Sequence, residues 1–174
     1  TQKEKNSVSK GKQSKISYIL MEYAPYGDFY DLIITKRIQF DEKLVRTYFH
    51  QLIQGLEYLH NRGFAHMDIK PDNILLSEDF ELKITDFDLS YYEGDDFLTG
   101  RGTPCYRAPE LVVESNCPFP QKADIYAAGI FLFVLKTGGK LPHSENILYQ
   151  DVNLSTLMYE DSQKFWKMHC EIND

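Results

Sequence analysis

The chain has 174 residues, of which 43% are hydrophobic and 26% are charged, and its formal net charge is −7. This length suffices for one domain with a hydrophobic core, and the acidic balance argues against a nucleic-acid partner, because phosphate backbones require a basic surface. Three cysteines without metal-ligand spacing indicate a reducing compartment, so we expect a cytoplasmic protein. The longest apolar run, residues 127–135, is far shorter than the roughly 20 residues of a membrane-spanning helix, and we expect no membrane partner. The oligomeric state stays open.

The N-terminal part of the chain changes from polar to apolar at residue 16. Residues 1–15 are rich in Lys, Ser and Gln and are expected to form a flexible loop. Residues 16–23 are β-branched and aromatic, which predicts a strand that ends at the turn residues 25–27. Asp28 can then cap a short helix whose apolar side chains are Phe29, Leu32 and Ile33.

Residues 41–61 carry the clearest helical period, with one apolar face that continues from Leu44 to Leu59. Asp41 suits the N-terminus of this helix, and Gly63 suits the position just past its end. Two short strands are predicted next, over residues 74–76 and 82–84.

The second half of the chain combines one long irregular segment with a second helix. Residues 86–110 have little periodicity, and irregular segments of this length inside a domain are usually functional. Residues 123–135 are apolar nearly all round and predict a buried helix, whereas residues from 146 onward have a weaker helical pattern. The expected fold class is therefore α+β, mostly α.

Three polar runs follow one another at a fixed order and spacing. The first is His66-Met67-Asp68-Ile69-Lys70-Pro71-Asp72-Asn73, the second is Thr85-Asp86-Phe87-Asp88, and the third is Gly102-Thr103-Pro104-Cys105-Tyr106-Arg107-Ala108-Pro109-Glu110. In this order they resemble the catalytic loop, the metal-binding loop and the substrate-facing loop of a protein kinase. Residues 16–160 are similar to the large C-terminal lobe of a eukaryotic protein kinase, including its hinge, and Lys70-Pro71 resembles the serine/threonine type.

The resemblance implies phosphoryl transfer from Mg²⁺-bound ATP to a serine or threonine hydroxyl of a protein substrate. Asp68 matches the catalytic base, and Lys70 is the cation that neutralises the transferring phosphoryl group. Asn73 and Asp86 match the metal ligands, and their oxygen atoms suit Mg²⁺. Asp124 resembles the buried aspartate that anchors the catalytic-loop backbone.

The same resemblance implies an adenine site. Met21 matches the gatekeeper residue, and the backbones of Glu22 and Ala24 are expected to bind the adenine edge. Leu75 is expected to form the adenine floor, and Asp28 is expected to lie near the ribose.

The chain departs from the family pattern in three ways. The glycine-rich phosphate loop and the phosphate-binding strand lysine do not occur in it, and the C-terminal helices look truncated, so we expect residues 16–174 to be a partial kinase domain with negligible activity alone. Met67 stands where most kinases carry an arginine that receives a phosphate on the activation segment, here residues 86–110, in which Thr99 is a candidate acceptor. Asp88 stands where the family has glycine. Met67 and Asp88 also leave an alternative, a pseudokinase that acts as a binding or scaffolding module.

Overall fold

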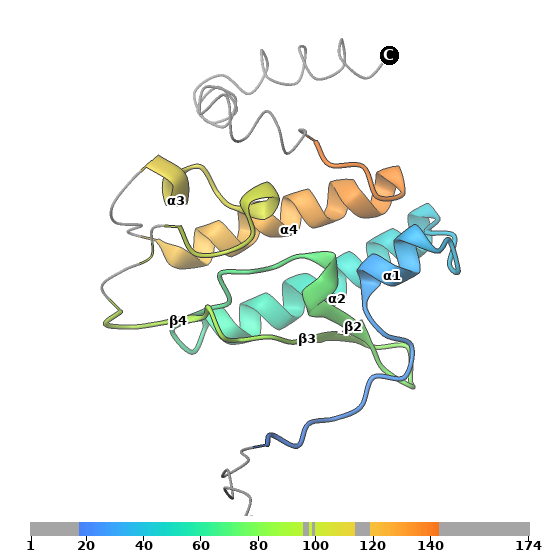
Figure 1. The fold of residues 1–174 in the computed structure, drawn as a ribbon, viewed down its shortest axis with the longest axis horizontal. Helices are drawn as coiled ribbons and strands as arrows, with labels where there is room; N and C mark the ends of the chain where they lie inside the picture. Colours follow the sequence, from blue (N-terminus) through green and yellow to red (C-terminus); the bar gives the residue numbers. More distant parts are fainter. Residues whose placement is uncertain (1–17, 96–97, 99, 114–118, 143–174) are drawn as a thin grey trace, which may run out of the picture.

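Two long helices form the centre of the fold (Figure 1). The computed structural model describes residues 18–95, 98, 100–113 and 119–142. Within these ranges, α2 (Glu42–His60) and α4 (Pro120–Thr137) pack side by side. The loop predicted over residues 1–15 and the weak helix predicted from residue 146 lie outside the described residues. No helix in the described part of the chain is long and apolar enough to cross a membrane.

Both predicted aspartate caps are confirmed. Oδ1 of Asp28 accepts a hydrogen bond of 2.8 Å from the backbone N–H of Asp31 at the start of α1 (Phe29–Ile34). Oδ1 of Asp41 accepts one of 2.8 Å from the backbone N–H of Leu44 at the start of α2. Each cap satisfies an N–H group that has no intrahelical partner, which stabilises a helix by about 1 kcal/mol.

Helix α4 extends beyond the predicted range of 123–135 at both ends. It begins with Pro120, whose fixed φ suits a first helical turn and whose missing N–H costs nothing there. It ends at Gly138, which adopts φ 69°, and the N–H of Gly139 returns to the carbonyl of Val134 at 2.9 Å. The prediction stopped short because the first and last turns are more polar than the buried middle of the helix.

The two predicted strands pair as an antiparallel hairpin. Strand β2 (Ile74–Leu76) pairs with β3 (Leu82–Ile84), and Ile74 lies opposite Ile84. The side chain of Gln51 on α2 accepts a hydrogen bond of 2.7 Å from the backbone N–H of Leu82. This bond fixes the hairpin against the central helix and thereby places the two loops that flank it.

A second two-stranded sheet was not predicted. Strand β1 (Phe64–Ala65) pairs with β4 (Tyr91–Tyr92), and the rings of Phe64 and Tyr92 lie 4.5 Å apart. Strands of two residues are too short to produce an alternating pattern. Strand β4 brings the beginning of the segment 86–110 next to the residues that precede the loop 66–73.

The strand predicted over residues 16–23 is wrong for the part that the structure describes. Residues 18–23 form no strand, and Ile19 and Leu20 are 85% and 93% exposed. Figure 1 shows this segment leading away below the β2–β3 hairpin. A strand requires a neighbour to accept its backbone hydrogen bonds, and no strand among the described residues pairs with it.

Among the residues that the structure describes, two apolar clusters hold the fold together. The larger one joins α1, α2 and α4 around the fully buried side chains of Phe29, Leu52, Leu56 and Phe131. The smaller one joins the segment 86–110 to β1, the loop that follows β1 and the start of α4; its buried members are Ala65, Met67, Leu98, Ala108, Leu111 and Ala123. The predicted fold class, α+β with mostly helical structure, is confirmed.

Candidate active site

The expected catalytic loop, residues 66–73, connects β1 to β2 and ends in a short 3-10 helix, η1 (Pro71–Asn73). Pro71 opens this turn with its fixed φ. Asp68 lies in the middle of the loop and is only 7% exposed. A carboxylate so deeply buried must have polar partners, and the structure supplies them from both sides.

Asp68 binds the substrate-facing loop through Thr103. Its Oδ1 accepts hydrogen bonds from the Thr103 hydroxyl at 2.7 Å and from the Thr103 backbone N–H at 2.8 Å. Its Oδ2 lies 3.0 Å from Nζ of Lys70, and the same ammonium group donates to Thr103 Oγ1 at 2.8 Å. The structure therefore brings the predicted base and the predicted cation into one closed triangle with Thr103.

These contacts keep Asp68 ionised. Burial by itself would raise the pKa of its carboxyl group, but the hydrogen bonds from Thr103 and Lys70 and the charge of Lys70 outweigh burial and lower the pKa below its ordinary value. An ionised carboxylate at neutral pH is the form that can accept or orient a hydroxyl proton.

Asn73 lies against the same carboxylate. Its Nδ2 donates to the backbone carbonyl of Asp68 at 2.9 Å and to Oδ2 of Asp68 at 3.0 Å. Because the amide nitrogen is used within the loop, Oδ1 is the atom that is left for a ligand. The backbone carbonyl of Asn73 accepts from the N–H of Thr85 at 3.0 Å, which places Asp86 beside this loop.

The predicted anchor role of Asp124 is confirmed. Its carboxylate, on α4, is 1% exposed and accepts hydrogen bonds from the backbone N–H groups of His66 at 2.7 Å and Met67 at 2.8 Å. The Nε2 of His60 on α2 lies 2.8 Å from the same carboxylate. Asp124 thus ties the catalytic loop to both central helices.

Met67 adopts an unusual backbone conformation, with φ 68°. A left-handed conformation costs a non-glycine residue about 1–2 kcal/mol. It persists because the two bonds to Asp124 fix the backbone and because the Met67 side chain, 5% exposed, packs in the smaller apolar cluster. Strain of this kind is concentrated at functional sites.

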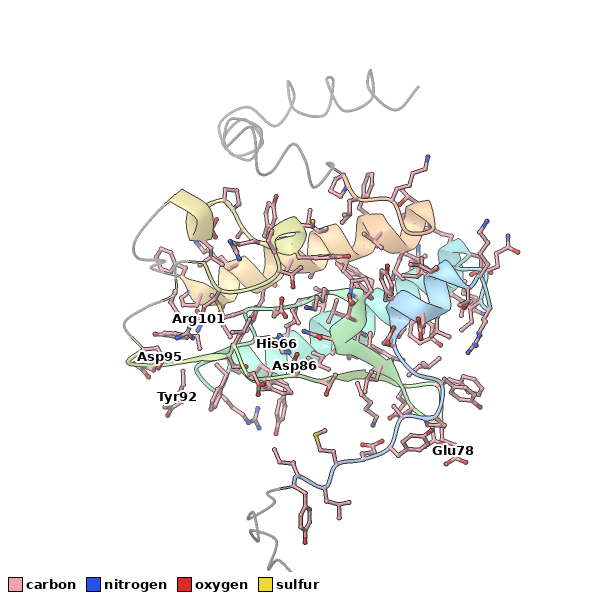
Figure 2. All side chains as sticks on the ribbon, in the orientation of Figure 1. His66, Glu78, Asp86, Tyr92, Asp95 and Arg101 are labelled. Carbon is pink, nitrogen blue, oxygen red and sulfur yellow. The ribbon has the colours of Figure 1, made fainter. Side chains whose placement is uncertain are left out.

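His66 is fully buried and its two ring nitrogens have different roles. Its Nδ1 faces the backbone N–H of Asp68 at 3.2 Å and must therefore accept, so Nε2 carries the proton and donates to the carbonyl of Thr85 at 2.9 Å. The ring also lies 4.9 Å from the ring of Phe87 in an edge-on arrangement. His66 therefore packs between the catalytic loop and the segment that carries Asp86, and Figure 2 shows His66 beside Asp86.

Gly102 allows the substrate-facing loop to approach the catalytic loop closely. It adopts φ 85°, and a Cβ atom at this position would lie 2.5 Å from the carbonyl oxygen of Met67. No other residue fits there without displacing one of the two loops. The contact at Gly102 brings Thr103, the next residue, within reach of Asp68.

The residues expected to bind Mg²⁺ fit a magnesium ion chemically. Asp86 is exposed and adopts φ 63°, and within the described residues its carboxylate makes no hydrogen bond or ion pair. It therefore offers a free carboxylate, one residue after Thr85, whose backbone N–H binds the carbonyl of Asn73. The described part of the chain contains no cluster of three or more His, Cys, Asp or Glu side chains suited to a metal. Mg²⁺ suits a site with few protein ligands, since it keeps several waters and binds substrate phosphates.

The residues expected around adenine fall into two groups, an exposed N-terminal segment and a pair on strand β2. Met21 is 70% exposed, and the Glu22 carboxylate lies 3.5 Å from Nζ of Lys83 on β3. Asp28 forms an isolated backbone bridge with Leu75, so these two residues do meet. The backbone carbonyl of Ala24 accepts a hydrogen bond from the N–H of Gly27, in the turn that leads from the exposed segment to Asp28. The described residues join Asp28 and Leu75 to the site, but leave Met21 on the exposed segment.

Comparison with known proteins identifies the family. A family model described as "Protein kinase domain" matches residues 6–168. The chain belongs to the protein kinase family. CBL-interacting protein kinase 26 of Oryza sativa subsp. japonica is 39% identical over 158 residues, which cover 88% of this chain and 31% of that protein. CBL-interacting serine/threonine-protein kinase 20 of Arabidopsis thaliana is 38% identical over 136 residues, covering 75% and 30%.

Solved structures agree with this assignment. A chain in the crystal structure of the yeast RNA Pol II CTD kinase CTDK-1 complex superposes with a TM-score of 0.64 at 29% identity, covering 72% of this chain and 42% of that chain. The kinase-like fold expected from the sequence is confirmed. The chain spans about 30% of the length of the two curated kinases.

The two substitutions in the kinase motifs are accommodated without disrupting the site. Asp88 is exposed and, unlike Asp86, does not adopt a positive φ, so the conformational freedom of glycine is not needed there. At position 67, methionine stands in place of the family's arginine, and its apolar side chain packs in the smaller cluster. Thr99, the candidate phosphate acceptor, lies outside the described residues.

The contacts of three residues in and around the site could not be predicted from the sequence. The sequence pattern gave Thr103 no role beyond its place in the third run, although it is the main partner of Asp68. Nothing in the sequence indicated the contact of His60 with Asp124 beyond the place of His60 on α2, and nothing indicated the contacts of Arg101. All three reach partners more than ten residues away in the chain, so spacing along the sequence could not reveal them.

Proposed function

We propose that this chain is the catalytic-lobe part of an enzyme that transfers a phosphoryl group from Mg²⁺-bound ATP to serine or threonine in a protein. The observation that carries the proposal is the buried, ionised Asp68, which Lys70 and Thr103 hold between the catalytic and substrate-facing loops. Packing alone does not require a charge at this place, because well-packed apolar residues often replace a buried ion pair without loss of stability.

In the proposed reaction Asp68 receives the proton of the acceptor hydroxyl. The hydroxyl oxygen forms a bond to the γ-phosphorus while the bond between that phosphorus and the ADP oxygen breaks, so the protein itself forms no covalent bond. Lys70, whose ammonium group already lies between Asp68 and Thr103, would neutralise charge on the transferring group. Positioning by these rigid contacts supplies the catalysis.

Asn73 and Asp86 would hold Mg²⁺ through Oδ1 and the carboxylate. When bound, the ion would neutralise phosphate charge. Met21, Glu22, Ala24, Asp28 and Leu75 remain our candidates for the adenosine part of ATP. The backbone bridge between Asp28 and Leu75 supports this for the ribose side, because it holds one carboxylate near the hairpin that begins at Ile74.

No observation favours the pseudokinase alternative. That alternative rested on Met67 and Asp88, and both are tolerated as described above, while the catalytic residues retain their contacts. A cytoplasmic location and the absence of nucleic-acid and membrane partners are further parts of the proposal, supported by the net charge of −7 and the cysteine pattern.

The experiment is phosphate transfer from radiolabelled ATP to three peptide pools in which serine, threonine or tyrosine is the sole acceptor. It uses the longest protein that carries this chain, in the wild-type form and as Asp68→Asn. Label on the serine or threonine pool, reduced at least about 100-fold by Asp68→Asn, supports the proposal. Label on tyrosine alone, or an Asp68→Asn variant as active as the wild type, contradicts it. Asp79→Asn, on the exposed β2–β3 turn, is the matched control.

A further inference from the structure

Arg101, in the second half of the activation segment, binds the backbone of residues near the start of the same segment. Nη1 of Arg101 donates hydrogen bonds to the backbone carbonyls of Leu89 at 3.3 Å and Ser90 at 3.1 Å. It also forms an ion pair with the carboxylate of Asp95 at 3.2 Å. The Arg101 side chain is 24% exposed, so it is partly shielded from solvent. Figure 2 shows Arg101 and Asp95 together, next to Tyr92 on β4.

The backbone that Arg101 grips is attached to the catalytic loop. Tyr91, directly after Ser90, pairs with Ala65 in the β1–β4 sheet, and the hydroxyl of Ser90 faces the carbonyl of His66 at 3.5 Å. Leu89 and Ser90 are therefore fixed relative to residues 65–66. An arginine that binds their carbonyls is held in a constant place with respect to the same loop.

The backbone of Arg101 leads directly to the reacting carboxylate. Its carbonyl accepts a hydrogen bond from Nε of Arg107 at 3.0 Å, and the Arg107 guanidinium also donates to the carbonyl of Gly102. Gly102 then contacts Met67, and Thr103 binds Asp68. Only one residue separates Arg101 from the group that binds the catalytic carboxylate.

The position of the positive charge distinguishes this chain from the family pattern. The catalytic-loop position that carries arginine in most kinases is Met67, which is buried among apolar side chains. Here the guanidinium comes from the activation segment, and its carboxylate partner, Asp95, comes from the same segment. The segment thus carries both charges of an ion pair that orders it.

We propose that Arg101 is a positioning residue, which holds Gly102 and Thr103 against the catalytic loop by clamping residues 89, 90 and 95. This inference rests on the proposed kinase function. It assigns Arg101 to the protein-substrate side of the site, because Thr103 belongs to the substrate-facing loop, whereas Leu75 and Asp28, which are expected at the nucleotide, meet on strand β2.

The test compares wild type, Arg101→Met, Arg101→Lys and Asp95→Asn in the longest protein that carries this chain. Arg37→Met is the matched control, because Arg37 is exposed and makes no ion pair among the described residues. The first readout is hydrogen exchange at the Thr103 amide, which needs no enzymatic activity. We expect Arg101→Met to speed this exchange about tenfold, Asp95→Asn to have a smaller effect, and Arg37→Met to have none.

The second readout is steady-state phosphorylation of a peptide. We expect Arg101→Met to raise KM for the peptide or lower kcat about tenfold while KM for ATP stays within about twofold, and Arg101→Lys to recover part of the loss. Unchanged Thr103 exchange in Arg101→Met overturns the clamp. Faster Thr103 exchange in Arg101→Met with unchanged peptide kinetics overturns the positioning role of Arg101. A rise in KM for ATP together with a lower overall stability of this variant also overturns that role.

The two proposals fail in different ways. If the wild-type protein transfers no phosphate but Thr103 exchange depends on Arg101, the kinase function fails together with the positioning role, whereas the clamp itself stands.

Discussion

The hydroxyl of Thr103 donates a hydrogen bond of 2.7 Å to Oδ1 of Asp68, a residue 35 positions earlier in the chain. Lys70 contacts both partners, so the three side chains form a closed set of polar contacts in a largely buried place. Oδ1 of Asp68 therefore has a fixed direction before any substrate binds, which is the form of preorganisation that catalysis by positioning requires.

Replacing Thr103 by valine should reduce phosphate transfer without unfolding the protein. Valine keeps the shape of threonine but removes the hydroxyl that binds Asp68 and Lys70. Because hydrogen bonds to charged groups are worth about 1.5–3 kcal/mol, we expect kcat/KM to fall about 10–100-fold. Thr103→Ser, which retains the hydroxyl, should stay within about threefold of wild type. Equal losses in both variants would show that the methyl group, not the hydroxyl, is needed.

Replacing Gly102 by alanine should destabilise the protein. The added Cβ would lie 2.5 Å from the Met67 carbonyl oxygen, and the backbone φ of 85° disfavours any side chain. Gly100→Ala is the matched control, because Gly100 has φ 78° but a Cβ atom added there would meet nothing within 4 Å. We expect the unfolding free energy from urea titration to fall by about 2 kcal/mol more in Gly102→Ala than in Gly100→Ala. Equal effects would mean that the two loops can separate freely.

Replacing Asp124 by asparagine should loosen the catalytic loop. The Asp124 carboxylate accepts two backbone N–H groups from the loop and faces Nε2 of His60, and the amide NH₂ of asparagine cannot accept from any of them. We expect a loss of about 3 kcal/mol in unfolding free energy, measured by urea titration, because buried donors would be left without a partner. Asp79→Asn, at an exposed turn, should lose less than about 0.5 kcal/mol. Similar losses in the two variants would contradict the anchor role.

The depressed pKa of Asp68 predicts the direction of a pH effect. Its folded-state pKa lies below the value of about 3.9 for an unfolded chain, so its stabilising contribution is complete above that value and is lost as the pH falls through the folded-state pKa. The difference in unfolding free energy between wild type and Asp68→Asn should be constant from about pH 7 to pH 5 and shrink below about pH 4. A difference that already shrinks above about pH 5 would mean that the pKa of Asp68 is raised.

Sequence patterns predicted the helices and strands whose hydrogen bonds and caps come from residues nearby in the chain. The period of α2 and the aspartates that cap α1 and α2 act within a few residues, so the chain reveals them directly. The β2–β3 hairpin is equally local, because its strands are separated by a short turn. The strand expected over residues 16–23 is different, since its hydrogen bonds depend on a neighbour that the described residues do not supply.

The candidate site was predictable only as a set of residue types in order. The runs around Asp68 and Asp86 indicated which groups carry the chemistry, and Asp124 was expected to anchor the catalytic loop. The contacts of Thr103 and Arg101 could not be predicted, because they depend on how the segment 86–110 folds back, and that segment has almost no periodic pattern. The pairing of β1 with β4 holds the beginning of this segment next to residues 64–65, and both strands are too short to recognise in the sequence.

The most direct test of the account is Mg²⁺-dependent phosphorylation of a serine or threonine peptide by the longest protein that carries this chain, measured beside Asp86→Asn. Asp86 makes no hydrogen bond or ion pair within the described residues, so its substitution should leave the fold and its thermal midpoint unchanged. The account predicts transfer that requires Mg²⁺ in the wild type and falls at least about 100-fold in the variant. Equal transfer by both proteins, or no transfer by a folded wild-type protein, would contradict it.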